Sequence, residues 1–280
     1  MKKVNKRNIQ KYTRMLIQLI FFLIMPSVYT TAFSGVKYIF TQMGNVQPLE
    51  LTSFVTILIV LCLYTMVLGR FFCGFACAFG TLGDYLHELY LWLCRKTKRR
   101  PIKINDSVKQ KLSTVKYFIL AAIVILCFKG VYQITKGFSP WDVFSMIIAG
   151  NFQINDYIPA LIILLIIVAG MLVCERFFCR FLCPMGAIFS LLPVLPIFSI
   201  ERNREQCIKE CSACKRVCPS GIELPNSGDD IQSGDCFMCQ KCMNICPKQN
   251  IKTSTIKGNS IIFILVRAVI LVIIMKLAGI

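Results

Sequence analysis

Residues 69–80 read GRFFCGFACAFG, and residues 175–186 read ERFFCRFLCPMG. These two stretches decide the fold. The arginine, the adjacent Phe-Phe pair, both cysteines and the final glycine coincide when the stretches are aligned. Each stretch follows an apolar run. The sequence therefore contains a duplicated unit, in which one helix leads outward, an outer loop turns, and a second helix returns to a Cys-x3-Cys pair.

The composition indicates a membrane protein. Hydrophobic residues make up 56% of the 280 residues, whereas soluble domains average roughly 45–50% apolar residues. The excess lies in runs long enough to cross a bilayer as helices, which takes about 20 residues. The predicted spans are residues 15–33, 51–70, 114–131, 158–175 and 260–279. We therefore expect a mainly α-helical integral membrane protein with a small soluble part.

The net charge of +18 follows the same topology. Lys and Arg gather in residues 1–14, 70–116 and 176–258 and are sparse in the two intervening loops. Positive charge marks cytoplasmic loops. These segments are therefore predicted to lie on the cytoplasmic side of a cell (inner or plasma) membrane that the chain crosses several times. The charge also suits anionic lipid headgroups or an acidic redox partner. Nucleic acid is not expected as a partner, because no binding motif accompanies the basic residues.

Both repeats begin on the same side of the membrane, so they are predicted to be parallel repeats related by an axis along the membrane normal. Such an axis brings the two Cys-x3-Cys pairs to one depth, facing each other. Because four cysteines commonly ligate an iron–sulfur cluster, we predict a third iron–sulfur or iron centre at the inner membrane surface, held by Cys73, Cys77, Cys179 and Cys183. Positions i and i+4 share a helix face, which lets either pair reach a common ion. The alternative is that these cysteines pack beside a turn.

Eight further cysteines form two quartets after the repeats. Residues 236–247 read CFMCQKCMNICP, which fits the bacterial ferredoxin run C-x2-C-x2-C-x3-C-P. Residues 207–219 read CIKECSACKRVCP, in which the first spacing is one residue longer. Three close thiolates wrap three irons of a cubane, and the fourth cysteine serves the other cluster in two-cluster ferredoxins. The quartets therefore predict two [4Fe–4S] clusters.

This crossed arrangement assigns four cysteines to each cluster. Cluster 1 takes Cys207, Cys211, Cys214 and Cys246. Cluster 2 takes Cys236, Cys239, Cys242 and Cys218. Zinc, which also accepts four thiolates, is the alternative metal.

The chain is thus predicted to have four parts. They are a first membrane repeat with an inner-surface helix (1–110), a second membrane repeat (111–200), a cytoplasmic two-cluster ferredoxin-like domain (201–258) and a final C-terminal transmembrane helix (259–280).

Together these motifs resemble those of membrane-bound polyferredoxins of the NapH and NosR type, which are integral membrane 4Fe–4S binding proteins with two Cys-x3-Cys-Pro motifs and a double [4Fe–4S] domain. The resemblance covers roughly residues 50–250 and departs at Ala78, where the family has proline. It implies an electron carrier between a quinol pool or cytoplasmic donor and a partner reductase. The expected partners are the lipid bilayer, redox partner proteins and quinone.

Two other functions fit the same cysteines. One is an accessory reductase that reduces a metal or cofactor during maturation of another enzyme, and the other is a membrane redox sensor. An electron-transfer subunit is favoured over a stand-alone enzyme. Because His87 is the single histidine, a bis-histidine haem is excluded.

Four other side chains carry expectations. His87 is expected to face lipid headgroups from an amphipathic helix, and Arg267 to extend from the last span toward the inner surface. Arg70 and Arg176 are expected either to bond a cluster or quinone headgroup or to anchor helix ends at the membrane surface.

Overall fold

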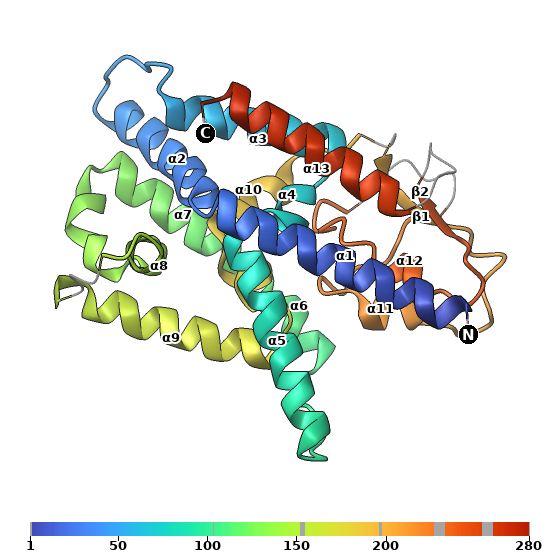
Figure 1. Cartoon of the computed structure of the whole chain (residues 1–280). Coiled ribbons are helices and arrows are strands. Elements are labelled where there is room, and N and C mark those ends of the chain that lie inside the picture. Colours follow the sequence, from blue (N-terminus) through green and yellow to red (C-terminus); the bar gives the residue numbers. More distant parts are fainter. Residues whose placement is uncertain are drawn as a thin grey trace. The chain divides into compact units, whose positions relative to one another are not determined.

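The computed structural model describes residues 2–102, 104–151, 155–195, 198–226, 233–253 and 260–279. The chain is mainly helical, as predicted (Figure 1). Its helices are α1 (Lys2–Ile24), α2 (Val28–Gly44), α3 (Ser53–Leu68), α4 (Phe71–Phe75), α5 (Ala78–Lys96), α6 (Asp106–Leu112), α7 (Val115–Phe128), α8 (Pro140–Ile148), α9 (Ile158–Val173), α10 (Pro184–Leu191), α11 (Ala213–Val217), α12 (Lys241–Ile245) and α13 (Ser260–Leu277). Shorter helical turns are η1 (Val131–Phe138), η2 (Asn155–Tyr157) and the π-helical η3 (Phe178–Leu182).

The chain forms two compact units, each built from separate parts of the sequence. The first unit combines Met1–Ile24, Val60–Cys77 and Ile188–Gly279, and the second combines Met25–Ile59 with Ala78–Ala187. The first Cys-x3-Cys pair therefore belongs to the same unit as both ferredoxin quartets. This grouping cuts across the four parts predicted from the order of the motifs.

The second unit is a helical assembly in which α5 packs against α9, and α2 packs against α7 (Figure 1). An aromatic core joins these helices. The ring centroids of Phe79 and Phe178 lie 4.6 Å apart, and Tyr29 meets Phe79 edge-on at 5.2 Å. Offset and edge-to-face contacts of this kind stabilise a core beyond the area they bury.

A buried ion pair also joins α5 to the segment before η3. The Arg176 guanidinium donates from Nε to Asp84 Oδ1 at 2.9 Å and from Nη2 to Asp84 Oδ2 at 2.6 Å. Both residues are buried. The bidentate geometry matches a planar guanidinium to a planar carboxylate, so Arg176 holds two helical segments together instead of anchoring to headgroups.

The first unit contains α1, α4 and α13, which contact one another, and the ferredoxin segment. That segment holds a two-stranded antiparallel sheet, with β1 (Ile200–Arg202) paired to β2 (Ile251–Thr253) and Arg202 opposite Ile251. The short helices α11 and α12 pack against each other. The segment's ends are thus paired, and its cysteines lie between them in the sequence.

Arg267 lies inside the first unit instead of extending toward a headgroup layer. It is 1% exposed, it donates from Nη2 to the Phe198 carbonyl at 3.3 Å, and its guanidinium lies 4.0 Å from the Phe263 ring centre. Aromatic faces and a carbonyl provide the negative partners that a buried cation requires. The snorkelling orientation predicted for Arg267 is therefore wrong.

The apolar runs form helices of unequal length. Within the described ranges, the helical stretch Asp106–Phe128 is long and apolar enough to cross a bilayer, and α1 with α2 adds a second candidate if the broken pair is one span. The span predicted over 15–33 is not one continuous helix, because α1 ends at Ile24 and α2 begins at Val28. Pro26 lies in this break, where proline disfavours helical geometry in the residue before it.

We expect Arg176→Leu to destabilise the protein by about 3–5 kcal/mol, because it removes the guanidinium from a buried carboxylate. Thermal or denaturant unfolding in detergent measures the change. The matched control is Glu88→Gln, which removes an Arg95–Glu88 pair at 3.5 Å whose side chains are 68% and 37% exposed. The control should change stability by less than about 1 kcal/mol. Equal stabilities for the two variants would contradict a structural role for the Arg176–Asp84 pair.

Candidate metal centres

The two Cys-x3-Cys pairs share an unusual local backbone. The Cys77 amide donates to the Phe72 carbonyl at 2.9 Å, and the Cys183 amide donates to the Phe178 carbonyl at 2.9 Å. Both are five-residue hydrogen bonds, as in a π-helix. In each pair the helical turn ends before the second cysteine. The expectation that each pair lies one turn apart on a regular helix face is therefore wrong.

Proline explains this geometry in one copy, and the other copy achieves it without proline. Cys183 has an extended backbone with ψ 115°, as expected for a residue before proline. The first copy has Ala78 in place of proline and still makes the corresponding hydrogen bond to Phe72. The departure from the family motif at Ala78 therefore leaves the local turn intact.

The four cysteines of these pairs are all buried. The Cys183 sulfur accepts a hydrogen bond from the Gly186 amide at 3.1 Å and lies 3.7 Å from the Tyr29 hydroxyl. The amide of Gly186 can stabilise a thiolate, which is the form that binds metal, whereas in the contact with Tyr29 the Cys183 thiol is the donor. The first pair lies in the first compact unit and the second pair in the second unit, so a shared centre stays a prediction.

The first Cys-x3-Cys copy packs against the ferredoxin loop that contains Cys236 and Cys239. A Cβ added at Gly74 would collide with the Phe237 carbonyl oxygen and would lie 4.0 Å from the Cys239 amide nitrogen. At Gly69, where φ is +73°, an added Cβ would lie 2.9 Å from Met238 Cγ. Glycine is thus required at both positions by the close approach of this loop.

The same two positions differ between the copies. Where the first copy has Gly69 and Gly74, the second has Glu175 and Arg180. Among the positions that differ between the copies, Gly69 and Gly74 are those that lie against the loop. The close approach of the ferredoxin loop therefore accounts for the two glycines of the first copy.

Arg70 reinforces this contact. Its Nη1 donates to the Gly234 carbonyl and to Asp235 Oδ1, each at 3.2 Å, and its guanidinium lies 4.9 Å from the Phe237 ring centre. Arg70 is 1% exposed. The arginine that the sequence placed near a cluster or headgroup thus fastens the loop leading into Cys236.

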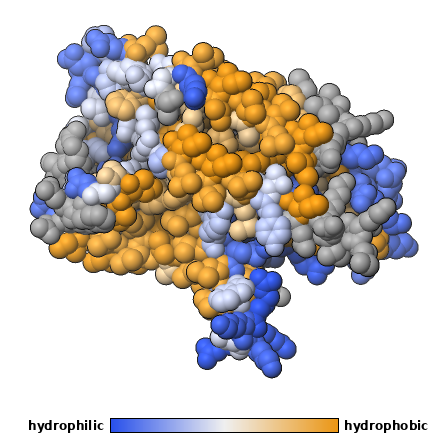
Figure 2. All heavy atoms as spheres, viewed as in Figure 1, coloured by the Kyte–Doolittle hydropathy of each residue, from blue (hydrophilic) through white to orange (hydrophobic). Residues whose placement is uncertain are grey.

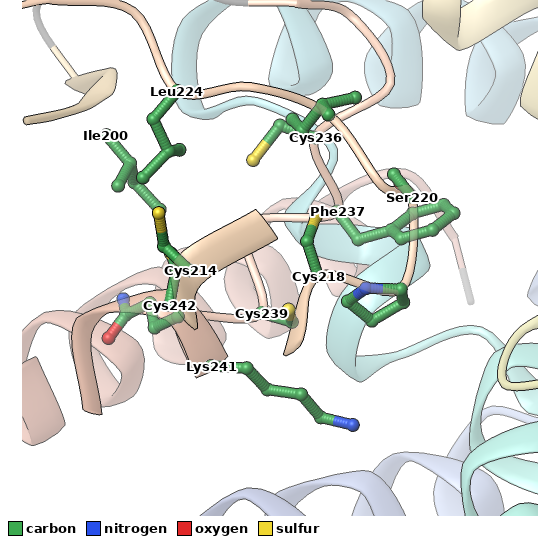
Figure 3. Close-up of a pocket in the computed structure, with 13 residues that line it drawn as sticks. Ile200, Cys214, Cys218, Ser220, Leu224, Cys236, Phe237, Cys239, Lys241 and Cys242 are labelled. Carbon is green, nitrogen blue, oxygen red and sulfur yellow. The ribbon is translucent and has the colours of Figure 1, made fainter. Parts of the chain in front are cut away.

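A pocket in the ferredoxin segment brings the four cysteines predicted for cluster 2 together (Figure 3). Cys214, predicted for cluster 1, lines the same pocket, as does Lys241. In Figure 3 the Cys214 sulfur points toward Ile200 and Leu224. The cysteines that line the pocket are Cys214, Cys218, Cys236, Cys239 and Cys242.

The electrostatics of this pocket reflect its crowded thiols. Burial raises the pKa of the Cys242 thiol well above its usual value, and the neighbouring Cys239 and Cys236 raise it further. Burial also raises the pKa of Cys218, while backbone amides near Ser220 oppose that shift. Several thiolates in one buried pocket repel one another, and iron bound between them compensates this repulsion because it is positive. The donor set therefore suits a multi-iron cluster.

Two of the four cysteines predicted for cluster 1 contact Asn250. Its Nδ2 lies 3.6 Å from the Cys207 sulfur, and its Oδ1 lies 3.5 Å from the Cys246 sulfur. These two cysteines come from different quartets, as the crossed assignment requires. The extra residue between Cys207 and Cys211 is accommodated by a turn in which Glu210 has φ +58°.

No group of three or more His, Cys, Asp or Glu side chains within the described ranges is gathered tightly enough to hold a metal ion. A [4Fe–4S] cluster distributes its four thiolates over four irons, and the residues lining the pocket fit that wider arrangement. None of the sixteen cysteines, all of which are described, forms a disulfide.

His87 also differs from its expected position. Its Nδ1 lies 2.9 Å from the Leu172 carbonyl oxygen on α9. The ring thus takes part in the packing of α5 on α9, and its predicted headgroup-facing role is wrong.

Comparison with known proteins agrees with the motifs. The family described as a 4Fe-4S binding domain matches residues 51–101 and 158–196. These ranges contain both Cys-x3-Cys copies. No solved structure matches the chain.

Several curated proteins are similar over longer stretches. An uncharacterized protein, MJ0750 of Methanocaldococcus jannaschii, is 28% identical, over 84% of this chain and 90% of its own. The ferredoxin-type protein NapH of Escherichia coli is 24% identical, over 72% of this chain and 67% of its own. The regulatory protein NosR of Pseudomonas aeruginosa is 26% identical over 61% of this chain, which spans 23% of NosR.

These matches define the chain as an iron–sulfur protein that carries a 4Fe–4S binding domain. The chain is similar to iron–sulfur electron transport proteins of the NapH and NosR type, which confirms the resemblance predicted from its motifs.

Sequence reasoning missed Arg202 and Asn250, which lie beside the predicted cluster 1 ligands. Arg202 Nη1 donates to the Cys214 sulfur at 3.4 Å. Neither residue belongs to a cysteine motif, so spacing gives no signal for them. The pairing of β1 with β2 places them, and that pairing joins segments about fifty residues apart.

We expect Gly74→Ala to destabilise the protein by about 1–3 kcal/mol, because the added methyl group overpacks a contact with backbone. The unfolding midpoint and the iron retained per chain measure the effect. Gly83→Ala is the matched control, since its added Cβ on α5 would lie 3.6 Å from Met171 Sδ on α9, an ordinary van der Waals contact. If the Gly74 variant matches this control in both measurements, the loop does not dock on the first copy.

Proposed function

We propose that this protein is a membrane-bound electron carrier in which two [4Fe–4S] clusters exchange electrons with a quinol pool or cytoplasmic donor and with a partner reductase. The observation that carries the proposal is the contact of Gly69 and Gly74 with the loop between Cys236 and Cys239. This contact joins a motif at the end of an apolar helix to the binding loop of cluster 2. Electrons that arrive at the membrane surface would then have a short path to the cluster.

Membrane insertion is supported by apolar side chains on helix surfaces. In α9 the exposed residues Ile158, Ile162, Leu165 and Ile166 are 54–63% exposed. In α13 the exposed residues include Ile262, Val266, Val269 and Ile273. Figure 2 shows hydrophobic side chains over the middle of α13. Contiguous apolar surface of this kind marks a membrane or protein interface.

The charged parts support the proposed orientation. The end of α5 and the residues after it form a hydrophilic projection in Figure 2. It includes Arg95, Lys96, Lys98, Arg99 and Arg100. Basic residues flanking apolar helices favour the cytoplasmic side. The ferredoxin segment is therefore proposed to lie in the cytoplasm, where cysteines stay reduced and available to iron.

The two clusters would accept and release single electrons, and the protein's residues would determine where this occurs. The Cys236–Cys239 loop is held by Arg70, and Phe237 and Met238 are buried against the first copy. These contacts fix the loop and exclude water from one side of the cluster 2 site. Burial and solvent exclusion are among the factors that set cluster potentials.

A third centre is proposed at the two Cys-x3-Cys pairs. Its support is that both copies make the same five-residue hydrogen bond and bury both cysteines. The Gly186 amide additionally favours the thiolate of Cys183. The proposed centre would relay electrons between the membrane and cluster 2.

A regulatory role is the second candidate, because the similar protein NosR is named a regulatory protein. Quinol-driven bleaching of the cluster absorbance in the purified protein supports electron transfer. If the cluster spectra change with the ambient redox potential but quinol does not reduce the clusters, a sensor is favoured.

We expect anaerobically purified protein to contain at least about eight irons and an equal amount of sulfide, since each [4Fe–4S] cluster has four. Cys239→Ser should remove or alter one EPR signal. Cys94→Ser is the control, because Cys94 lies on α5 outside all four motifs. A chain with one zinc and no labile sulfide, or unchanged spectra in Cys239→Ser, would contradict the proposal.

The third centre predicts more than eight irons per chain, and Cys179→Ala should remove only the excess while both ferredoxin signals persist. Iron analysis with EPR measures this. Cys127→Ala, at a buried cysteine on α7 outside the motifs, provides the control. Unchanged iron in the Cys179 variant would show that the pairs pack without binding metal.

A further inference from the structure

Asn250 lies between two proposed ligands of cluster 1. It is 7% exposed, and its Nδ2 donates to the Asn203 carbonyl at 2.8 Å as well as approaching the Cys207 sulfur at 3.6 Å. The Asn203 contact fixes the orientation of the amide. When Cys246 binds iron it loses its thiol proton, so its contact with Asn250 Oδ1 ends, whereas the amide donor to Cys207 remains.

Arg202 supplies a positive charge to the same site. Its backbone is held by the pairing of β1 with β2, opposite Ile251, and its amide donates to the Pro225 carbonyl at 3.0 Å. From this position Nη1 reaches the Cys214 sulfur at 3.4 Å. Asn250 immediately precedes β2, so one small sheet places both residues beside cluster 1.

A second N–H group of Arg202 also indicates that an acceptor lies nearby. Its Nε–H is buried and has no protein acceptor among the residues that the structure describes. A buried guanidinium N–H normally has a partner. A cluster with bridging sulfides and four thiolates is an anion that can accept it.

These contacts affect the two oxidation states of the cluster unequally. One-electron reduction adds one negative charge to the thiolate-bound cluster and leaves its ligands in place. A neighbouring cation and N–H donors stabilise the more negative state, so they favour reduction. Hydrogen bonds to the sulfurs are a recognised determinant of cluster potential.

We propose that Arg202 and Asn250 are positioning residues that raise the reduction potential of cluster 1, the cluster assigned to Cys207, Cys211, Cys214 and Cys246. The inference rests on the proposed function, because it requires that both clusters are present. It assigns the control of one cluster to two residues outside every cysteine motif.

Anaerobic potentiometric titration with dithionite, followed by EPR, tests the proposal on the full-length protein. Arg202→Gln should make one of the two cluster signals about tenfold harder to reduce, a shift of about 59 mV for one electron, while the other signal keeps its potential. Asn250→Leu should shift the same signal in the same direction. Arg202→Lys should preserve most of the parent potential, because it keeps the charge.

Arg204→Gln is the matched control, since it removes the same charge two residues away. The Arg204 side chain is 56% exposed and pairs with Glu223 at 3.6 Å. Unchanged potentials in Arg202→Gln, or an equal shift in Arg204→Gln, would overturn the inference. If Arg202→Gln loses a cluster, Arg202→Lys and Asn250→Leu decide the question by their potentials. A parent protein without two cluster signals would contradict the proposed function itself.

Discussion

The approach of the Phe237 carbonyl to Gly74 is the constraint on which the first unit depends. A side chain at position 74 would separate the Cys236–Cys239 loop from the helix end that bears Cys73, and Gln18 secures the same spot by donating to the Gly74 carbonyl at 3.0 Å. Arg70 then fastens the loop from the other side through Gly234 and Asp235. One backbone contact thus ties the N-terminal helix, the first Cys-x3-Cys turn and the ferredoxin segment into a single packed body, which explains why residues so distant in sequence form one unit.

The duplicated motif has kept its turn and changed its partners. In both copies the amide of the second cysteine bonds five residues back, so the turn depends on the shared Phe-Phe-Cys pattern and not on proline. The arginines differ in what they bind: Arg70 pairs with Asp235, whereas Arg176 pairs with Asp84. Each buried guanidinium needs an acceptor, and each copy finds one on the segment that packs against it. The same local sequence therefore serves loop docking in one copy and helix packing in the other.

The cysteine spacings predicted the 4Fe–4S class, because ligand spacing is set by local reach and can be read along the chain. Cys218, Cys236, Cys239 and Cys242 line one pocket, but Cys214 lines it too, so the crossed ligand assignment stays a prediction. Cysteine spacing gives no information on contacts between residues that are distant in the sequence. Arg202 and Asn250 reach cysteines predicted for cluster 1 through a strand pair, and the need for Gly69 and Gly74 arises from a loop about 165 positions away. The departures from prediction had local causes: Pro26 lies where an apolar run that hydropathy treats as continuous is broken, and Arg267 contacts Phe198 and Phe263 in place of solvent.

The ferredoxin segment has little regular structure to stabilise it. Its strands β1 and β2 have three residues each, and α11 and α12 have five. Helices shorter than about 12–15 residues are marginal in water without tertiary support, and a lone pair of strands is equally weak. Support comes from the contact with Gly74 and from the clusters, whose binding energy becomes folding energy when the ligands come from distant parts of a chain. The predicted crossed ligand sets would increase this effect, because each cluster would then join both quartets, and iron loss at one site would loosen the loop that the other site and the first Cys-x3-Cys copy both contact.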